Sequence, residues 1–133
     1  IPGQNDSYEE IARLCDWLLK ELGPEVPLHF TAFHPDYKMN DLPRTPAHTL
    51  SQAREQAKAF GIHHVYTGNI HDSSGQSTYC PGCQKLLIER DWYRLGRFEI
   101  VEGVCNSCGK RIAGEFESEC GNWGAKRQPL RFV

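Results

Sequence analysis

The sequence is organised around two short cysteine pairs, Cys80-Pro81-Gly82-Cys83 and Cys105-Asn106-Ser107-Cys108. Two C-x-x-C pairs separated by 21 residues have the spacing of a structural zinc site. A tight turn lets both thiolates of a pair face one ion, and we expect Gly82 and Gly109 to let the backbone fold round the sulfurs without a Cβ clash. Two such turns supply four thiolates, which complete a tetrahedral shell and leave no position for water or substrate. The sequence therefore predicts a structural metal site formed by Cys80, Cys83, Cys105 and Cys108.

Three chemistries suit four such thiols, and the spacing favours zinc. Iron in a rubredoxin-like site takes the same ligands, so ligand type alone does not separate the two metals. Two disulfides would instead need an oxidising compartment. Six cysteines, four of them in metal spacing, suit a reducing environment better than a secreted disulfide scaffold. We therefore expect a cytoplasmic protein that holds structural zinc.

The residues around the cysteines predict a small zinc-ribbon-like β module with a tail, residues 76–133. Residues 85–89 and 93–101 have the pattern of strands held between the two cysteine turns. Such a unit has too little core to fold alone, so the metal is expected to supply much of its stability. The tail, residues 115–133, contains Trp123 and several basic residues and is expected to lie on the body. Cys120 is unpaired and is not expected to join a shell that is already full.

Residues 1–75 follow the order of a parallel α/β sheet. The pattern predicts a strand end at residues 1–6, a helix from Ser7 to Gly23, a strand over residues 27–33, a helix from Thr45 to Gly61 and a strand over residues 62–68. A linker rich in Ser and Gly follows, through Gln76. The expected buried stripes of the two helices are Ile11, Leu14, Leu18 and Leu22, with Cys15 as a small buried hydrophobe beside them, and Leu50, Ala53, Ala57 and Phe60.

A sheet of so few strands is incomplete. Parallel sheets need both faces covered, and two helices cannot cover them, so partner strands must come from residues absent here or from another chain. The open edge predicts self-association when the segment is isolated. The chain opens with Ile1 in mid-motif, which leads us to expect a piece of a longer protein.

Composition and charge favour neither nucleic acid nor a membrane as a partner. The formal net charge is −2, and the basic residues near the cysteines alternate with acidic ones, which is typical of a solvated face. No apolar run approaches the roughly 20 residues that cross a bilayer. Nucleophile-elbow, P-loop and HExxH motifs are absent from the sequence.

Polar side chains follow three successive strand ends, at Gln4-Asn5-Asp6, His34-Pro35-Asp36 and Asn69-Ile70-His71-Asp72. Ligands of parallel α/β folds lie outside the carboxyl ends of the strands, so these loops predict one rim of a shared site. His34 is as well explained by a loop-capping role as by ligand contact. We expect no role for His29, His48, His63 and His64.

The chain resembles a known enzyme family in several motifs that occur in one order. They are Ile1-Pro2-Gly3-Gln4-Asn5-Asp6, Pro27-Leu28-His29-Phe30, Phe33-His34-Pro35-Asp36-Tyr37-Lys38, Val65-Tyr66-Thr67-Gly68-Asn69 and Thr78-Tyr79-Cys80-Pro81-Gly82-Cys83. Together they resemble the C-terminal part of pyruvate formate-lyase activating enzyme-like radical SAM proteins, of the kind called AmmeMemoRadiSam system radical SAM enzymes. The resemblance implies the last βα units of a partial TIM-type barrel, followed by a zinc-ribbon-like tail.

The resemblance also implies cofactors and contacts. In that family, S-adenosylmethionine lies across the carboxyl ends of the barrel strands against a [4Fe-4S] cluster. His34 matches the histidine beside the nucleoside of the cofactor, and Pro2, Gly3 and Asn5 match the loop after the preceding strand. The remaining N-terminal part of the enzyme, and a protein or small-molecule substrate, are the implied partners.

One departure from the family is large. The C-x3-C-x2-C motif that holds the cluster is absent from this sequence, so the chain alone is not expected to cleave S-adenosylmethionine. Two other functions stay open, a non-enzymatic zinc-ribbon adaptor and a rubredoxin-like electron carrier. Upstream cysteines in the parent protein would favour the enzyme, and a coloured protein with iron at the four cysteines would favour the carrier.

Overall fold

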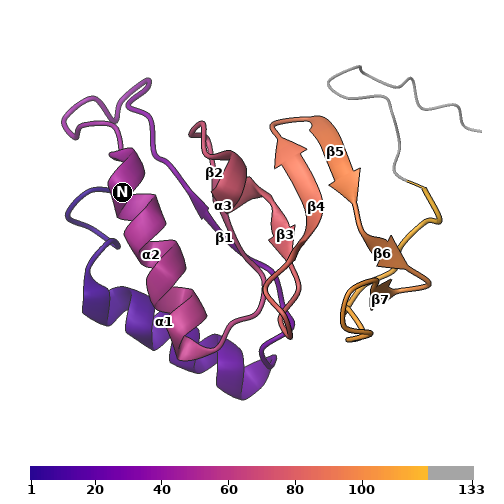
Figure 1. Ribbon diagram of the computed structural model, residues 1–133. Coiled ribbons are helices and arrows are strands. Elements are labelled where there is room, and N and C mark those ends of the chain that lie inside the picture. Colours follow the sequence, from indigo (N-terminus) through magenta and orange to yellow (C-terminus); the bar gives the residue numbers. More distant parts are fainter. Residues whose placement is uncertain (120–133) are drawn as a thin grey trace, which may run out of the picture.

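The structure is a computed structural model, described for residues 1–119, and it has two parts (Figure 1). The predicted tail beyond residue 119, with Cys120 and Trp123, lies outside the described residues. In chain order the elements are α1 (Tyr8–Glu21), β1 (Leu28–Thr31), α2 (Ala47–Phe60), β2 (Val65–Gly68), α3 (Ser73–Gln76), β3 (Thr78–Tyr79), β4 (Leu86–Asp91), β5 (Arg94–Phe98), β6 (Ile100–Val101) and β7 (Val104–Cys105). Both helix–strand alternation and a β module at the cysteines are therefore confirmed.

The first part is a parallel strand pair covered by helices on one side. β1 and β2 run parallel, with Leu28 opposite Val65 and Thr31 opposite Gly68. In Figure 1, α1 and α2 lie together on one side of this pair and the strands β3 to β7 lie on the other side. α2 packs on both strands and α1 packs on α2. Within residues 1–119 the sheet has two strands and does not close into a barrel.

The start of α1 is confirmed and the expected start of α2 is wrong. The Ser7 hydroxyl accepts a hydrogen bond from the Glu10 N–H, as an N-cap does. The N-cap of α2 is Pro46, which makes no side-chain cap. The Thr45 hydroxyl instead accepts from the Phe33 N–H at 2.9 Å, which ties the loop after β1 to the start of α2. Gly61 ends α2 with φ 107°, as predicted.

The apolar stripe of α1 is confirmed in part. Ile11 and Leu18 are buried and Cys15 is fully buried, while Leu14 and Leu22 are 38% and 54% exposed. The core that these residues join includes Val65 of β2, with Leu28 and Phe30 of β1 packed against it. α1 therefore buries only the side that faces this core. The core of this part comprises Ile11, Cys15, Leu18, Ala53, Ala57, Ile62 and Val65.

The predicted linker before the cysteines is instead the short helix α3. The Asp72 carboxylate accepts hydrogen bonds from the Gly75 N–H, the Ser74 hydroxyl and the Thr67 hydroxyl. These bonds lower the pKa of Asp72 although burial acts to raise it. A Cβ on Gly75 would collide with the Asp72 and Thr67 side chains, so this residue fits only as glycine. The turn thus fixes the exit from β2 toward the β module.

The second part, which we call the ribbon module, spans residues 78–112. β3, β4 and β5 form an antiparallel sheet, and β6 and β7 form a separate hairpin. Its core comprises Cys80, Leu87, Ile88, Ile100, Cys105 and Ile112. With so few buried apolar side chains, two of them cysteines, the module gains from a bound metal.

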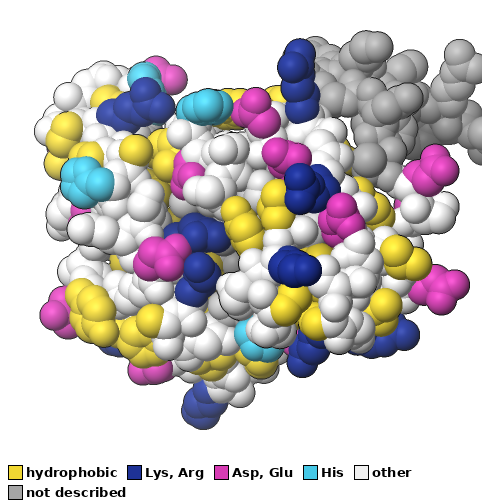
Figure 2. All heavy atoms as spheres, viewed as in Figure 1, with side chains coloured by type: hydrophobic (Ala, Val, Ile, Leu, Met, Phe, Trp, Pro, Cys, Tyr) yellow, Lys and Arg dark blue, Asp and Glu magenta, His cyan; other side chains and the backbone are white. Residues whose placement is uncertain are grey.

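The surface of the described part carries charges of both signs. Figure 2 shows Lys and Arg side chains interspersed with Asp and Glu over the face it displays. This agrees with the solvated face expected from the sequence. None of the helices within residues 1–119 has the length and apolar character that crossing a bilayer requires.

Candidate metal centre

The two cysteine turns have the same backbone hydrogen bonds. In the first turn, the Cys80 N–H donates to the Lys85 carbonyl and the Gln84 N–H donates to the Cys80 carbonyl, both at 2.9 Å. In the second turn, the N–H of Cys105 donates to the carbonyl of Lys110, and the N–H of Gly109 donates to the carbonyl of Cys105, again at 2.9 Å. Each turn therefore holds its two cysteines on one side by the same pair of bonds.

The glycine that each turn needs was predicted correctly in one turn only. Gly109 has φ 72°, the left-handed conformation that glycine adopts without a steric cost. In the first turn the equivalent residue is Gln84, with φ 59°, and not Gly82. Gly82 instead donates a hydrogen bond from its N–H to the Cys80 Sγ at 3.3 Å. Such N–H···S bonds orient a thiolate and offset its charge.

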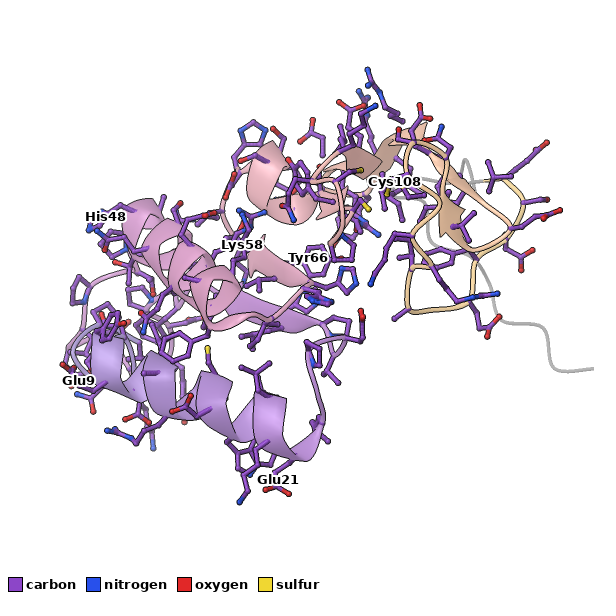
Figure 3. All side chains as sticks on the ribbon, turned by 60° about the horizontal axis from the view of Figure 1, so that its bottom comes forward. Glu9, Glu21, His48, Lys58, Tyr66 and Cys108 are labelled. Atoms are coloured by element: carbon purple, nitrogen blue, oxygen red, sulfur yellow. The ribbon has the colours of Figure 1, made fainter. Side chains whose placement is uncertain are left out.

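The four sulfurs form a compact cluster. The Sγ atoms of Cys80 and Cys108 are 3.6 Å apart, and those of Cys83 and Cys105 are 3.8 Å apart. All four lie within 4.8 Å of one another. With metal–sulfur bonds of about 2.3 Å, the edges of a tetrahedron are about 3.8 Å long. The sulfur positions therefore fit a tetrahedral ion such as zinc, and Figure 3 labels one of the four cysteines, Cys108.

The crowded thiols titrate over a wide pH range. Burial acts to raise the pKa of Cys105, but the N–H groups of Ser107 and Cys108 and the neighbouring thiols lower it to about 7. The N–H of Lys110 acts to lower the pKa of Cys108, whereas burial and the other three thiols raise it to about 12. A divalent cation at the centre favours the thiolate form of all four.

The cluster lies at the edge of the ribbon module. Cys80 and Cys105 are buried, Cys83 is half-buried and Cys108 is exposed. Since all four ligands come from the chain, an ion held here has no open position for a substrate. The site can stabilise the module and cannot act as a Lewis acid without losing a ligand.

The N-terminal loop residues that were predicted to contact the cofactor make hydrogen bonds within their own turn. The Asn5 side-chain oxygen accepts from the Ile1 ammonium at 2.7 Å, and the Asp6 carboxylate accepts from the Gly3 N–H at 2.8 Å. Gly3 has φ 72°, so this tight turn uses its glycine. Pro2 lies half-buried within the same turn.

The other two strand-end loops are brought partly together. His34 is exposed after β1, and among residues 1–119 no hydrogen bond joins it to Pro2, Gly3 or Asn5. The Arg44 guanidinium, in the loop after His34, donates to the Asn69 carbonyl at 3.1 Å. The loops after β1 and β2 thus share one edge of the sheet, as the parallel order requires. Ligand contact by His34 stays a prediction.

Two adjacent histidines, the half-buried His63 and the buried His64, were given no role from the sequence. His63 and His64 precede β2 and do not lie within it. Both face the Glu25 carboxylate, with His63 Nδ1 and His64 Nε2 at 3.1 and 3.5 Å from its two oxygens. Burial lowers the pKa of His64, although Glu25 acts to raise it. This cluster closes the end of the sheet where β1 and β2 begin.

Comparison with known proteins gives one curated relative. The chain is 40% identical over 114 residues to an uncharacterized protein of Methanocaldococcus jannaschii, MJ0808. The match covers 84% of this chain and 34% of the relative, so the chain spans about a third of the relative's length. No family model matches the chain, and no solved structure matches it.

Proposed function

We propose that this chain is the C-terminal part of a radical SAM activase-like enzyme, in which the ribbon module holds a structural zinc ion. The observation that carries the proposal is the incomplete parallel sheet. β1 and β2 pair only with each other among the described strands, and α2 covers one face of the pair. Parallel strands are stable when further strands and helices enclose them.

The missing strands are assigned to an N-terminal part of the same polypeptide. The relative from Methanocaldococcus jannaschii is matched over 84% of this chain but only 34% of its own length. A protein of that length has room for the additional βα units of a TIM-type barrel. The second partner that we propose for this chain is a protein or small-molecule substrate.

The ribbon module supplies stability in this proposal. Sulfur–sulfur distances of 3.6 and 3.8 Å suit zinc, and the small core of the module explains why a metal is needed. We assign Cys80, Cys83, Cys105 and Cys108 as its ligands.

The [4Fe-4S] cluster does not fit on the described residues. Cys15 is fully buried in the helical core, and the other four cysteines of residues 1–119 surround a single point in the ribbon module. The cluster ligands are therefore assigned to the part of the polypeptide that precedes this sequence. S-adenosylmethionine would contact His34, with Pro2, Gly3 and Asn5 in the neighbouring loop.

Metal analysis of the full-length parent protein, purified without oxygen, tests the proposal. We expect about one zinc and about four iron atoms per polypeptide, with a brown iron–sulfur absorption. The matched variant Cys83→Ser should lose zinc and keep the brown absorption, because the two sites are separate.

Two other outcomes would overturn the proposal in different directions. A colourless protein with one zinc would leave the adaptor function. An iron absorption that Cys83→Ser abolishes would place iron at the four cysteines and favour an electron carrier.

A His34→Ala variant of the brown protein should bind S-adenosylmethionine more weakly than the parent.

A further inference from the structure

A cavity of about 480 Å³ lies between the uncovered face of the β1–β2 pair and the hairpin of β4 and β5. Volumes of this size hold small organic ligands. The residues that characterise its lining are His29, Tyr66, Gln76, Arg90, Trp92 and Tyr93. Figure 3 shows Tyr66 near the middle of the molecule, between α2 and the ribbon module.

The floor of the cavity is aromatic. His29 and Tyr66 are opposite each other in β1 and β2, and their rings stack with centroids 4.9 Å apart and an angle of 29°. Rings that stack on each other at this separation turn their faces toward one another, so they offer their edges to the cavity. A ring edge packs well against the face of another aromatic ring. The floor therefore favours a molecule with an aromatic ring.

The positively charged side chain of Arg90 lies next to Tyr66. The Arg90 guanidinium lies 5.8 Å from the centre of the Tyr66 ring. Its Nη1 donates to the Thr78 hydroxyl at 2.6 Å, and the Tyr66 hydroxyl shares a hydrogen bond with the same Thr78 oxygen at 2.9 Å. These bonds fix the guanidinium beside the ring.

The cavity lining carries positive charge and no negative charge from the described residues. Arg90 contributes a permanent positive charge, and the lining contains no carboxylate from the described residues. Asp91, the next residue in the hairpin, faces His71 at 3.3 Å. A carboxylate or phosphate group on a ligand would pair with the guanidinium, which binds such planar anions well.

The hairpin turn that walls the cavity is strained at an aromatic residue. Trp92 has φ 53°, at a turn position that favours Asn, Asp or Gly. Its N–H donates to the Gln76 side-chain oxygen at 2.8 Å, and the Gln76 amide donates to the Ile70 carbonyl at 2.9 Å. Gln76 therefore fixes the turn to the loop after β2. Backbone strain that the surrounding contacts hold in place is common at ligand sites.

The side chains of this turn are available to a ligand. Trp92 is 51% exposed and Tyr93 is 69% exposed. Neither belongs to the buried core of the ribbon module, which includes Leu87 and Ile112. Exposed aromatic rings at a cavity mouth cover a bound ring at little entropic cost.

We propose that this cavity binds a planar aromatic molecule that carries a carboxylate or phosphate group. The ring packs against the edges of His29 and Tyr66, Trp92 and Tyr93 cover it, and the anionic group pairs with Arg90. The inference uses only β1, β2, α3 and the β4–β5 hairpin, and it requires neither the iron–sulfur cluster nor S-adenosylmethionine.

Calorimetric titration of the full-length parent protein with three naphthalene probes tests this site. We expect saturable binding of 2-naphthoate or 2-naphthyl phosphate, and the tighter of the two identifies the anionic group. The neutral 2-naphthalenemethanol should bind about tenfold more weakly or worse, since it cannot pair with Arg90. Equal affinity for the alcohol and both anions, or no binding of any probe, would overturn the proposal.

Variants separate binding from folding. Tyr93→Ala should weaken binding of the preferred anion about tenfold, while Trp17→Ala, which removes another exposed aromatic residue on α1, should leave it unchanged. Arg90→Gln should remove the preference for the anion, and Arg90→Lys should retain part of it. Trp92→Gly should weaken binding and raise the melting temperature, because glycine relieves the positive φ. Unchanged affinity in both Tyr93→Ala and Trp92→Gly would contradict the site.

Discussion

Gln84 and Gly109 occupy the same position in the two cysteine turns, four residues after the first cysteine, with φ values of 59° and 72°. Each donates its N–H to the carbonyl of that first cysteine at 2.9 Å. One turn therefore carries its left-handed residue as glycine and the other carries it as glutamine. The difference makes the two turns unequal in strain although their hydrogen bonds are the same.

Substitutions at this pair should have opposite effects. A non-glycine residue in the left-handed conformation costs roughly 1 kcal/mol, so Gln84→Gly should stabilise the ribbon module and Gly109→Ala should destabilise it by about that amount. A Cβ on Gly109 would meet nothing within 4 Å, so the effect is purely conformational. Gly82→Ala is the control, because Gly82 has no positive φ and its Cβ would make ordinary contacts with Lys110 and the Cys108 Sγ. The melting temperatures of the three zinc-loaded variants measure these effects. Equal shifts for Gly82→Ala and Gly109→Ala would refute a conformational role for Gly109.

Removing one metal ligand should unfold one part of the chain. Cys83→Ser or Cys108→Ser is expected to release the metal and unfold the ribbon module, because its small core depends on the ion. The helices α1 and α2 have their own buried cluster and should stay largely intact. Circular dichroism with metal analysis measures both effects.

Cys15→Ala is the matched control for these variants. Cys15 is fully buried in the helical core, so its loss should lower stability and leave the metal content unchanged. If Cys83→Ser instead abolishes the whole fold, the predicted boundary at residue 75 does not separate two folding units.

Protonation of His64 at acidic pH should lower the stability of the folded protein. Burial holds the pKa of His64 below its ordinary value of about 6.5, and Glu25 offsets this only in part. A depressed histidine pKa means that the neutral form is favoured in the folded state. Its contribution is therefore complete above the unfolded pKa and is lost as the pH falls through the folded pKa.

Hydrogen exchange near the start of β2 between about pH 7.5 and pH 5 measures this loss. His64→Gln should flatten the pH dependence, because glutamine does not titrate. A His64 ring resonance that titrates above its ordinary value would reverse the predicted sign.

The isolated segment should self-associate. β1 has one partner strand, β2, among the strands of residues 1–119, which leaves backbone N–H and C=O groups at an open edge. Light scattering of residues 1–133 as a function of concentration should show dimers or larger species. A strictly monomeric segment that melts in one cooperative step would show that the edge is closed some other way.

The sequence predicted the features that depend on local pattern. The cysteine spacing located the metal cluster, and Ser7 and Gly61 located helix ends, because turns and caps need particular residues nearby in the chain. Buried stripes were less accurate. Leu14 is exposed because only one side of α1 faces the core, and which side that is depends on the tertiary arrangement.

The sequence could not reveal residues that meet across the fold. His29 and Tyr66 stack only because β1 and β2 are in register, and the Arg90 guanidinium reaches them from the hairpin that follows. One local signal was present but was not used. Trp92 and Tyr93 form a two-residue hairpin turn without the Gly or Asn that such turns favour.

The most direct test of the proposed enzyme is the formation of 5′-deoxyadenosine from S-adenosylmethionine under anaerobic, reducing conditions. The full-length parent protein with its iron–sulfur centre should form this product, and residues 1–133 alone should form none, because their described cysteines hold no such centre. Absence of the product from a brown, iron-containing parent protein, or its formation by the isolated segment, would contradict the account.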